Sequence, residues 1–143
     1  MALIGRFQKL DGDKARIYAD LSTGAELVIK GTETPDALQP LLVLVAKLMN
    51  TISADIRTVI SEMVESQMVD ASACCNELQI LEAKKWRLTI QRVTLQLESM
   101  GIRDMTQDEN DIQEQLNDIE DCMAEKRLEL KQMQYEAQVE MET

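Results

Sequence analysis

Apolar residues recur every three or four positions along the last third of the chain, which is the spacing of one helix face. Only one polar residue interrupts this series, and its long aliphatic stem can cover apolar surface while its ammonium group reaches water. The series comprises Ile112, Leu116, Ile119, Met123, Lys126, Leu130, Met133 and Ala137. It predicts a helix over about 107–141.

The preceding segment, about 71–100, carries two apolar stripes at helical spacing. One stripe steps by four and three alternately and comprises Trp86, Ile90, Val93, Leu97 and Met100. The second stripe runs beside it and comprises Leu78, Leu81, Leu88, Leu95 and Ile102. Two stripes on one helix require more than one neighbour, so we expect a bundle or an oligomer.

Turn signals separate these two helices. Gly101 suits a C-terminal helix cap, and Thr106 with Glu109 three residues later forms a capping-box pattern. A loop this short makes the flanking helices antiparallel neighbours. The sequence therefore predicts a long antiparallel coiled-coil hairpin. Its seam would consist of Trp86, Ile90, Val93, Leu97, Ile112, Leu116, Ile119 and Met123.

The remaining stripe residues of the hairpin would then be exposed and available to another molecule. These candidate interface residues are Leu78, Leu81, Leu88, Leu95, Ile102, Leu130 and Met133.

An apolar helix is predicted over about 35–68. Its start is indicated by Thr34 as the N-cap, Pro35 at the first helical position and Asp36 in an acidic first turn. Apolar positions then recur at helical spacing as far as Met63, and the pattern weakens between 66 and 72. The sequence leaves open whether the helix is continuous there.

The first 34 residues are expected to be non-helical. They hold most of the chain's five glycines, and "RIYADL" and "AELVIK" flank "STG" as in a β-hairpin. Two short strands are marginal in water, so this segment would be poorly ordered or docked on a partner. We thus expect an all-α protein with a segment 1–34 and a helical coiled-coil domain 35–143.

The composition agrees with long helices, and the charge is unevenly distributed. Aromatic residues make up only 3% of the chain, while 45% of residues are hydrophobic. Residues 1–100 carry a net charge of −2, and residues 101–143 carry −9 of the total −11. An acidic chain of this kind argues against binding nucleic acid or anionic lipid, both of which favour a basic surface.

No motif for catalysis is found. The chain has no His, which removes the usual general base and the commonest zinc ligand, and its glycines are isolated. We therefore predict no enzymatic activity, no cofactor and no metal site. Cys74, Cys75 and Cys122 have neither the spacing of a zinc site nor a plausible disulfide pairing, so they are expected to be free thiols.

No cleavable secretory signal is recognised, and the most apolar run, Leu41–Met49, is shorter than the roughly 20 residues of a membrane-spanning helix. The run "LVLVAKLMNTISADIRTVISEMVESQM" with the helical hairpin after it resembles segments of type III secretion translocators and filament-forming tip proteins, over about 38–100. From the missing signal we expect synthesis in the cytoplasm. The resemblance implies export to the bacterial surface and assembly into a polymer or pore.

The function predicted from the sequence is that of a structural subunit. It would self-associate through its helical seams into an oligomer or filament, without nucleic acid. The alternative is an adaptor or chaperone that binds an amphipathic helix of a partner protein. A membrane-active translocator that inserts Leu41–Val45 is a third possibility.

Overall fold

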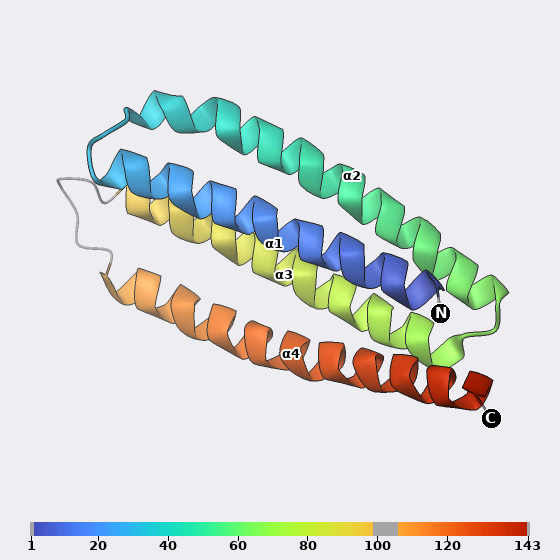
Figure 1. The fold of residues 1–143 in the computed structure, drawn as a ribbon. Coiled ribbons are helices and arrows are strands. Elements are labelled where there is room, and N and C mark those ends of the chain that lie inside the picture. The colour runs from blue at the N-terminus through green and yellow to red at the C-terminus, as the bar shows by residue number, and fades with distance from the viewer. Residues whose placement is uncertain (1, 99–105, 143) are drawn as a thin grey trace.

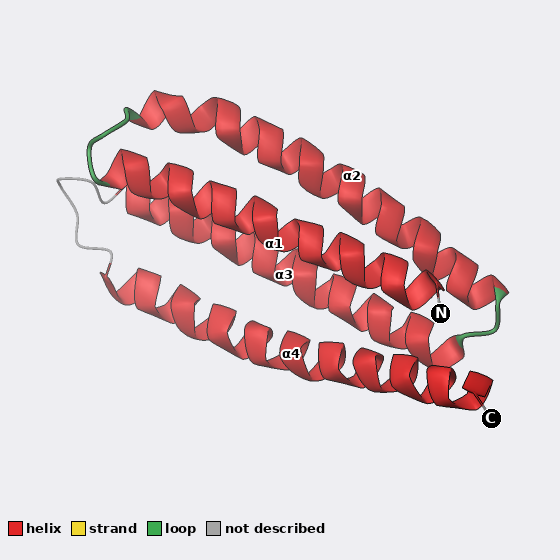
Figure 2. Cartoon of the chain, in the orientation of Figure 1, coloured by secondary structure: helices red, strands yellow, loops and turns green. Residues whose placement is uncertain are grey.

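The described part of the chain, residues 2–98 and 106–142 of a computed structural model, is helical throughout and contains no strand (Figure 2). Four α-helices are present: α1 (Ala2–Ile29), α2 (Leu38–Glu65), α3 (Val69–Glu98) and α4 (Thr106–Glu142). A short 3-10 helix, η1 (Pro35–Ala37), precedes α2. The prediction of an all-α protein is confirmed. None of these helices is both long and apolar enough to cross a membrane.

Helix α1 corrects the prediction for the first 34 residues, which is wrong in expecting a non-helical segment or a β-hairpin. Its buried positions follow helical spacing and include Ile4, Phe7, Ile17 and Leu21. Gly24, which was interpreted as a turn residue, lies inside the helix. A Cβ there would overlap the Leu41 side chain of α2. The glycine therefore permits close approach of two helices and does not mark a turn.

The C-terminus of α1 is the true turn. Gly31 has a φ of 78°, in the left-handed region that glycine occupies without strain. Its N–H donates to the Val28 carbonyl at 3.0 Å, and the Thr32 N–H donates to the Leu27 carbonyl at 2.9 Å. This hydrogen-bond pair is a Schellman motif, which caps the last carbonyls of the helix.

A second Schellman motif resolves the question left open at 66–72. The Gln67 N–H donates to the Val64 carbonyl at 3.0 Å, and the Met68 N–H donates to the Met63 carbonyl at 2.8 Å. Gln67 itself has a φ of 63°. The helix is therefore interrupted, and the chain reverses between α2 and α3.

The four helices lie side by side with successive helices running in opposite directions (Figure 1). Helix α1 packs mainly against α2, and α3 mainly against α4. These two hairpins meet where α3 contacts both α1 and α2. Helices α2 and α4 lie on opposite sides of the bundle (Figure 1).

The packing of α3 corrects the predicted seam. The stripe of Trp86, Ile90, Val93 and Leu97 packs with the apolar faces of α1 and α2. The other stripe faces α4: Leu88 and Leu95 contact Ile112 and Leu116, while Leu78 and Leu81 share a cluster with Met123, Leu130 and Met133. The roles predicted for the two stripes are therefore exchanged.

The candidate interface residues consequently lie within the molecule. Leu78, Leu88 and Leu130 are buried, and Leu81, Leu95 and Met133 are half-buried against the same clusters. Ile102 and Met100 fall outside the described residues. The apolar surface that was expected to bind another molecule is thus used for packing α3 and α4 together.

Candidate functional site

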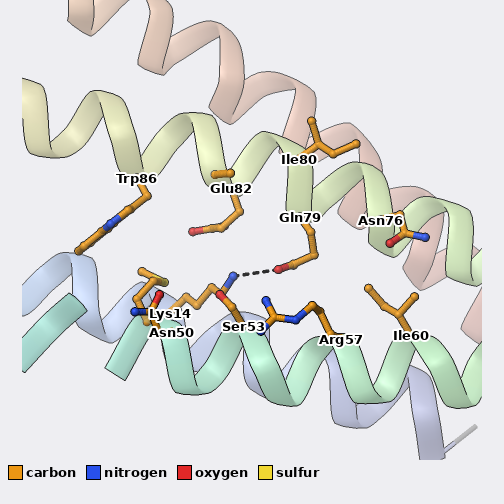
Figure 3. A pocket seen from close by; sticks show the side chains of 12 residues that line it. Lys14, Asn50, Ser53, Arg57, Ile60, Asn76, Gln79, Ile80, Glu82 and Trp86 are labelled. Carbon is orange, nitrogen blue, oxygen red and sulfur yellow. Dashed lines mark hydrogen bonds between the residues drawn. The ribbon is translucent and has the colours of Figure 1, made fainter. Parts of the chain in front are cut away.

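A groove between α2 and α3 is lined by polar and apolar side chains from three helices. Its volume is about 540 Å³. We call it the α2–α3 groove. The residues that define it are Lys14 of α1; Met49, Asn50, Ser53, Arg57 and Ile60 of α2; and Asn76, Gln79, Ile80, Glu82, Ala83 and Trp86 of α3. Figure 3 shows Trp86 at one end of the α3 wall and Asn76 at the other.

A buried ion-containing cluster forms the floor of this groove. Lys14 is only 2% exposed, and its Nζ donates to Gln79 Oε1 at 3.0 Å (Figure 3). Burial lowers the pKa of Lys14, and the charges of Glu82 and Asp11 oppose that shift. A lysine in the interior of a helix bundle requires such partners, because an isolated buried charge is strongly unfavourable.

Some polar atoms of this cluster have no protein partner. Glu82 is 4% exposed, yet its Oε1 accepts no hydrogen bond from the described residues. The buried Nε2 of Gln79 likewise has no acceptor there. Buried polar groups are normally paired in folded proteins. The Tyr18 hydroxyl, which lies close to Glu82, is also buried without a partner, so these polar atoms belong to the packed interior and not to the open surface of the groove.

Two aromatic rings adjoin the cluster. Tyr18 of α1 and Trp86 of α3 meet edge to face, with ring centroids 5.7 Å apart. Lys85 Nζ lies 4.2 Å from the centroid of the Tyr18 ring, a cation–π contact. Burial, followed by the nearby Glu82 charge, raises the pKa of Tyr18, so the phenol remains protonated. These contacts hold Trp86 in place at the end of the groove.

Ion pairs fix α4 on the other side of α1 and α3. Arg127 donates twice to Asp11 of α1, from Nε at 2.8 Å and from Nη2 at 3.2 Å. Lys126 pairs with Glu77 of α3 at 2.5 Å. A cavity of about 560 Å³ between α1 and α4 is lined by Asp11 and Arg127, whose charges already satisfy each other. This second cavity is for that reason the weaker candidate site.

The charge of the molecule is divided between its two sides. Helix α4 contains twelve Asp and Glu against three Lys and Arg, a net charge of −9. The described residues before it, 2–98, carry a net charge of only −2. Helices α2 and α4 lie on opposite sides of the bundle (Figure 1), so α1 and α3 separate α2 from most of the negative charge.

The cysteines play no part in the groove. Cys74 and Cys75 are buried in the core near α4, Cys122 is exposed on α4, and all three thiols are free. Cys74 Sγ donates to the Lys126 carbonyl at 3.1 Å. Burial raises the pKa of Cys75 to about 12, which keeps this thiol protonated and unreactive at neutral pH. Within residues 2–98 and 106–142 no group of three or more metal-ligating side chains is found.

The groove residues were not singled out from the sequence. One usable signal was present, because Lys14 occupies a core position between Phe7 and Ile17 on the apolar face of α1. That pattern was hidden when the segment was interpreted as a β-hairpin. Trp86 was assigned to the hairpin seam, and Met49 was named as the end of the most apolar run.

Comparison with known proteins corrects the predicted function. The family model described as DNA repair REX1-B matches residues 2–99, which is more than half of the chain. No curated protein and no solved structure matches. The predicted secretion-filament subunit is wrong, because the family points to DNA repair, and the alternative adaptor gains no support from it. The exclusion of nucleic acid as a partner is wrong for the same reason. The chain belongs to the DNA repair REX1-B family.

Proposed function

We propose that this protein acts in DNA repair and contributes binding, not catalysis. The observation that carries the proposal is the family match over residues 2–99, which includes the whole of α1, α2 and α3. The absence of His from the sequence and the isolation of its glycines support a non-enzymatic role. Helix α4 lies beyond residues 2–99, which we call the matched unit, and it contacts that unit chiefly through α3.

The division of charge makes this role physically reasonable. DNA-binding surfaces must offset phosphate charge, and a uniform net charge of −11 would oppose contact. The matched unit is nearly neutral, however, and its helix α2 lies on the side of the bundle opposite α4. We propose that α4 pairs with α3 as an antiparallel coiled coil, which the four-and-three spacing of apolar residues supports. Helix α4 would stabilise the matched unit by packing against α3 while its charged face stays in solvent.

Survival after DNA damage tests this proposal. Cells of the native host with the gene deleted would be exposed separately to ultraviolet light, an alkylating agent and an oxidant. We expect reduced survival after at least one treatment and slower removal of the corresponding lesion, both restored by the full-length chain. Equal survival of deleted and complemented cells after all three treatments would refute a role in DNA repair.

A matched pair of α4 variants controls for folding in this assay. Leu130 is 1% exposed and Leu128 is 67% exposed. Leu130→Asp should abolish complementation because it places a charge in the core. Leu128→Asp makes the same change on the surface of the same helix and should complement fully.

A further inference from the structure

The outer face of α4 carries a continuous line of exposed side chains. Its members follow one another at alternating steps of four and three residues, so they lie along one side of the helix. Helix α4 lies at the edge of the bundle and packs chiefly against α3, which leaves this side uncovered (Figure 1). We call it the outer stripe. It consists of Glu114, Asp118, Asp121, Glu125, Leu128, Gln132, Tyr135 and Val139, all of which are exposed.

The C-terminal half of the outer stripe is apolar. Tyr135 is 67% exposed and Val139 is 39% exposed, and Leu128, where the two halves meet, is 67% exposed. Single apolar side chains are ordinary on a protein surface. Here three of them follow one another on the same side of one helix. This apolar end is therefore a surface that another molecule can cover.

The N-terminal half of the outer stripe determines the charge of that molecule. Its four carboxylates, at 114, 118, 121 and 125, form no ion pair within the described residues. The three cations of α4 lie off the stripe: Lys126 and Arg127 pair with carboxylates of α3 and α1, and Lys131 lines the cavity between α1 and α4. Like charges three or four residues apart repel one another along a helix. Cationic side chains laid along the row would relieve this repulsion.

We propose that the outer stripe binds a Lys- and Arg-rich segment of another protein. Cations of the segment pair with the four carboxylates, and apolar side chains beyond them cover Tyr135 and Val139. Position 128 adjoins both halves and accepts either an apolar or an acidic side chain. Nucleic acids and acidic proteins are repelled by the row, and a wholly apolar partner would leave its carboxylates without counter-charges. The inference goes beyond the repair function proposed above and does not depend on it.

The length of the outer stripe sets the size of the segment. From Glu114 to Val139 the helix rises about 38 Å, at about 1.5 Å per residue. An extended chain covers that distance with about 12 residues. Exposed ion pairs are individually weak and are screened by salt. We therefore expect binding in the micromolar range at low salt, weakened severalfold at physiological salt.

Fluorescence anisotropy of a labelled peptide measures this binding. The probe would have about 14 residues, with four lysines in one half and two leucines in the other, separated by serine and glycine. A second peptide would carry glutamate in place of each lysine. We expect the full-length protein to bind the lysine peptide saturably and the glutamate peptide not at all. Absence of saturable binding of the lysine peptide, or equal binding of both peptides, would overturn the proposal.

Paired neutralising variants locate the contact. Asp121→Asn with Glu125→Gln should weaken binding of the lysine peptide about fivefold, because two ion pairs are lost. Asp20→Asn with Glu65→Gln makes the same change of net charge at exposed positions of α1 and α2 and should change the affinity less than twofold. Equal weakening by the two pairs would mean that the peptide responds to net charge alone, and the outer stripe would not be the site.

Tyr135→Ser tests the apolar half. It should weaken binding of the lysine peptide about threefold, because the leucines lose their contact. A third peptide with serine in place of both leucines should bind the native chain and Tyr135→Ser equally. If Tyr135→Ser weakened neither peptide, or both to the same extent, the apolar contact would be wrong. Circular dichroism verifies that each variant keeps the helical fold, and failure of these binding tests would leave the repair function standing.

Discussion

The left-handed backbone of Gln67 offers a direct test of the reversal between α2 and α3. Its φ of 63° is sterically unfavourable for a residue with a Cβ, by about 1–2 kcal/mol. The Gln67 side chain is exposed, and the two hydrogen bonds of the cap involve only backbone atoms. Gln67→Gly therefore removes the strain and leaves the cap intact.

The expected gain is smaller than the strain, because glycine makes the unfolded chain more flexible. That entropic effect offsets about 0.5–1 kcal/mol. We expect Gln67→Gly to raise the free energy of unfolding by about 0.5–1 kcal/mol. For a chain of this size the midpoint of thermal unfolding should rise by roughly 2–4 °C per kcal/mol.

The same substitution at Gln91 is the matched control. Gln91 is exposed in the interior of α3, where the backbone is helical and no left-handed residue is needed. Gln91→Gly should lower the free energy of unfolding by about 0.5–1 kcal/mol. Urea denaturation followed by the helical circular dichroism signal measures both changes. If both variants were destabilised, the left-handed cap assigned to Gln67 would be wrong.

Three further predictions concern packing, ion pairing and thiol chemistry. Gly24→Ala should change the free energy of unfolding by less than about 1 kcal/mol, because the gain in helix propensity offsets the displacement of the terminal Leu41 methyl group that the new Cβ meets; a loss of several kcal/mol in urea denaturation would contradict this. Asp11→Asn should lower the free energy of unfolding by about 1–2 kcal/mol at neutral pH, because Arg127 loses a charged partner. A double-mutant cycle with Arg127→Gln should measure the coupling energy between the two side chains. Iodoacetamide should label the exposed Cys122 in the folded protein and should label Cys75 only when the protein unfolds. Mass spectrometry measures the labelling rate of each cysteine, and equal rates for the two would contradict the burial of Cys75.

The periodicity of the sequence was sufficient to predict the helices after residue 34. Expected at about 35–68, 71–100 and 107–141, they are found at 38–65, 69–98 and 106–142. Glycine misled the prediction for α1, because Gly5, Gly12 and Gly24 were taken as turn residues. A helical glycine that allows close contact with a neighbouring helix has the same sequence signal as a turn glycine, and only the position of α2 distinguishes them.

The two stripes of α3 show a second limit of sequence patterns. Their spacing established that α3 has two apolar faces, but periodicity does not say which neighbour each face meets. Because α1 was not recognised as a helix, the stripe containing Trp86 was assigned to α4. Once α1 and α2 supply a second surface, that stripe packs against them instead.

The prediction of partners was wrong because it used the net charge of the whole chain. The net charge of −11 was taken to exclude nucleic acid, although residues 1–100 carry only −2 of it. Long helices separate charges in space, so an acidic α4 does not determine the field on the opposite side of the bundle. The side chains of the groove, drawn from α1, α2 and α3, come together only in the folded chain.

The contact between Lys14 and Gln79 also determines how α1 can align along α3. The two helices run in the same direction (Figure 1), and most of their contact is apolar and tolerant of sliding. A slip of seven residues would place the Lys14 ammonium opposite Trp86, whose indole offers a donor and no lone-pair acceptor. The apolar stripes would still match, but the ammonium would lose its acceptor in a dry environment. This hydrogen bond of 3.0 Å therefore adds a polar requirement to the turns and to the Tyr18–Trp86 contact that also fix the alignment of α1 along α3.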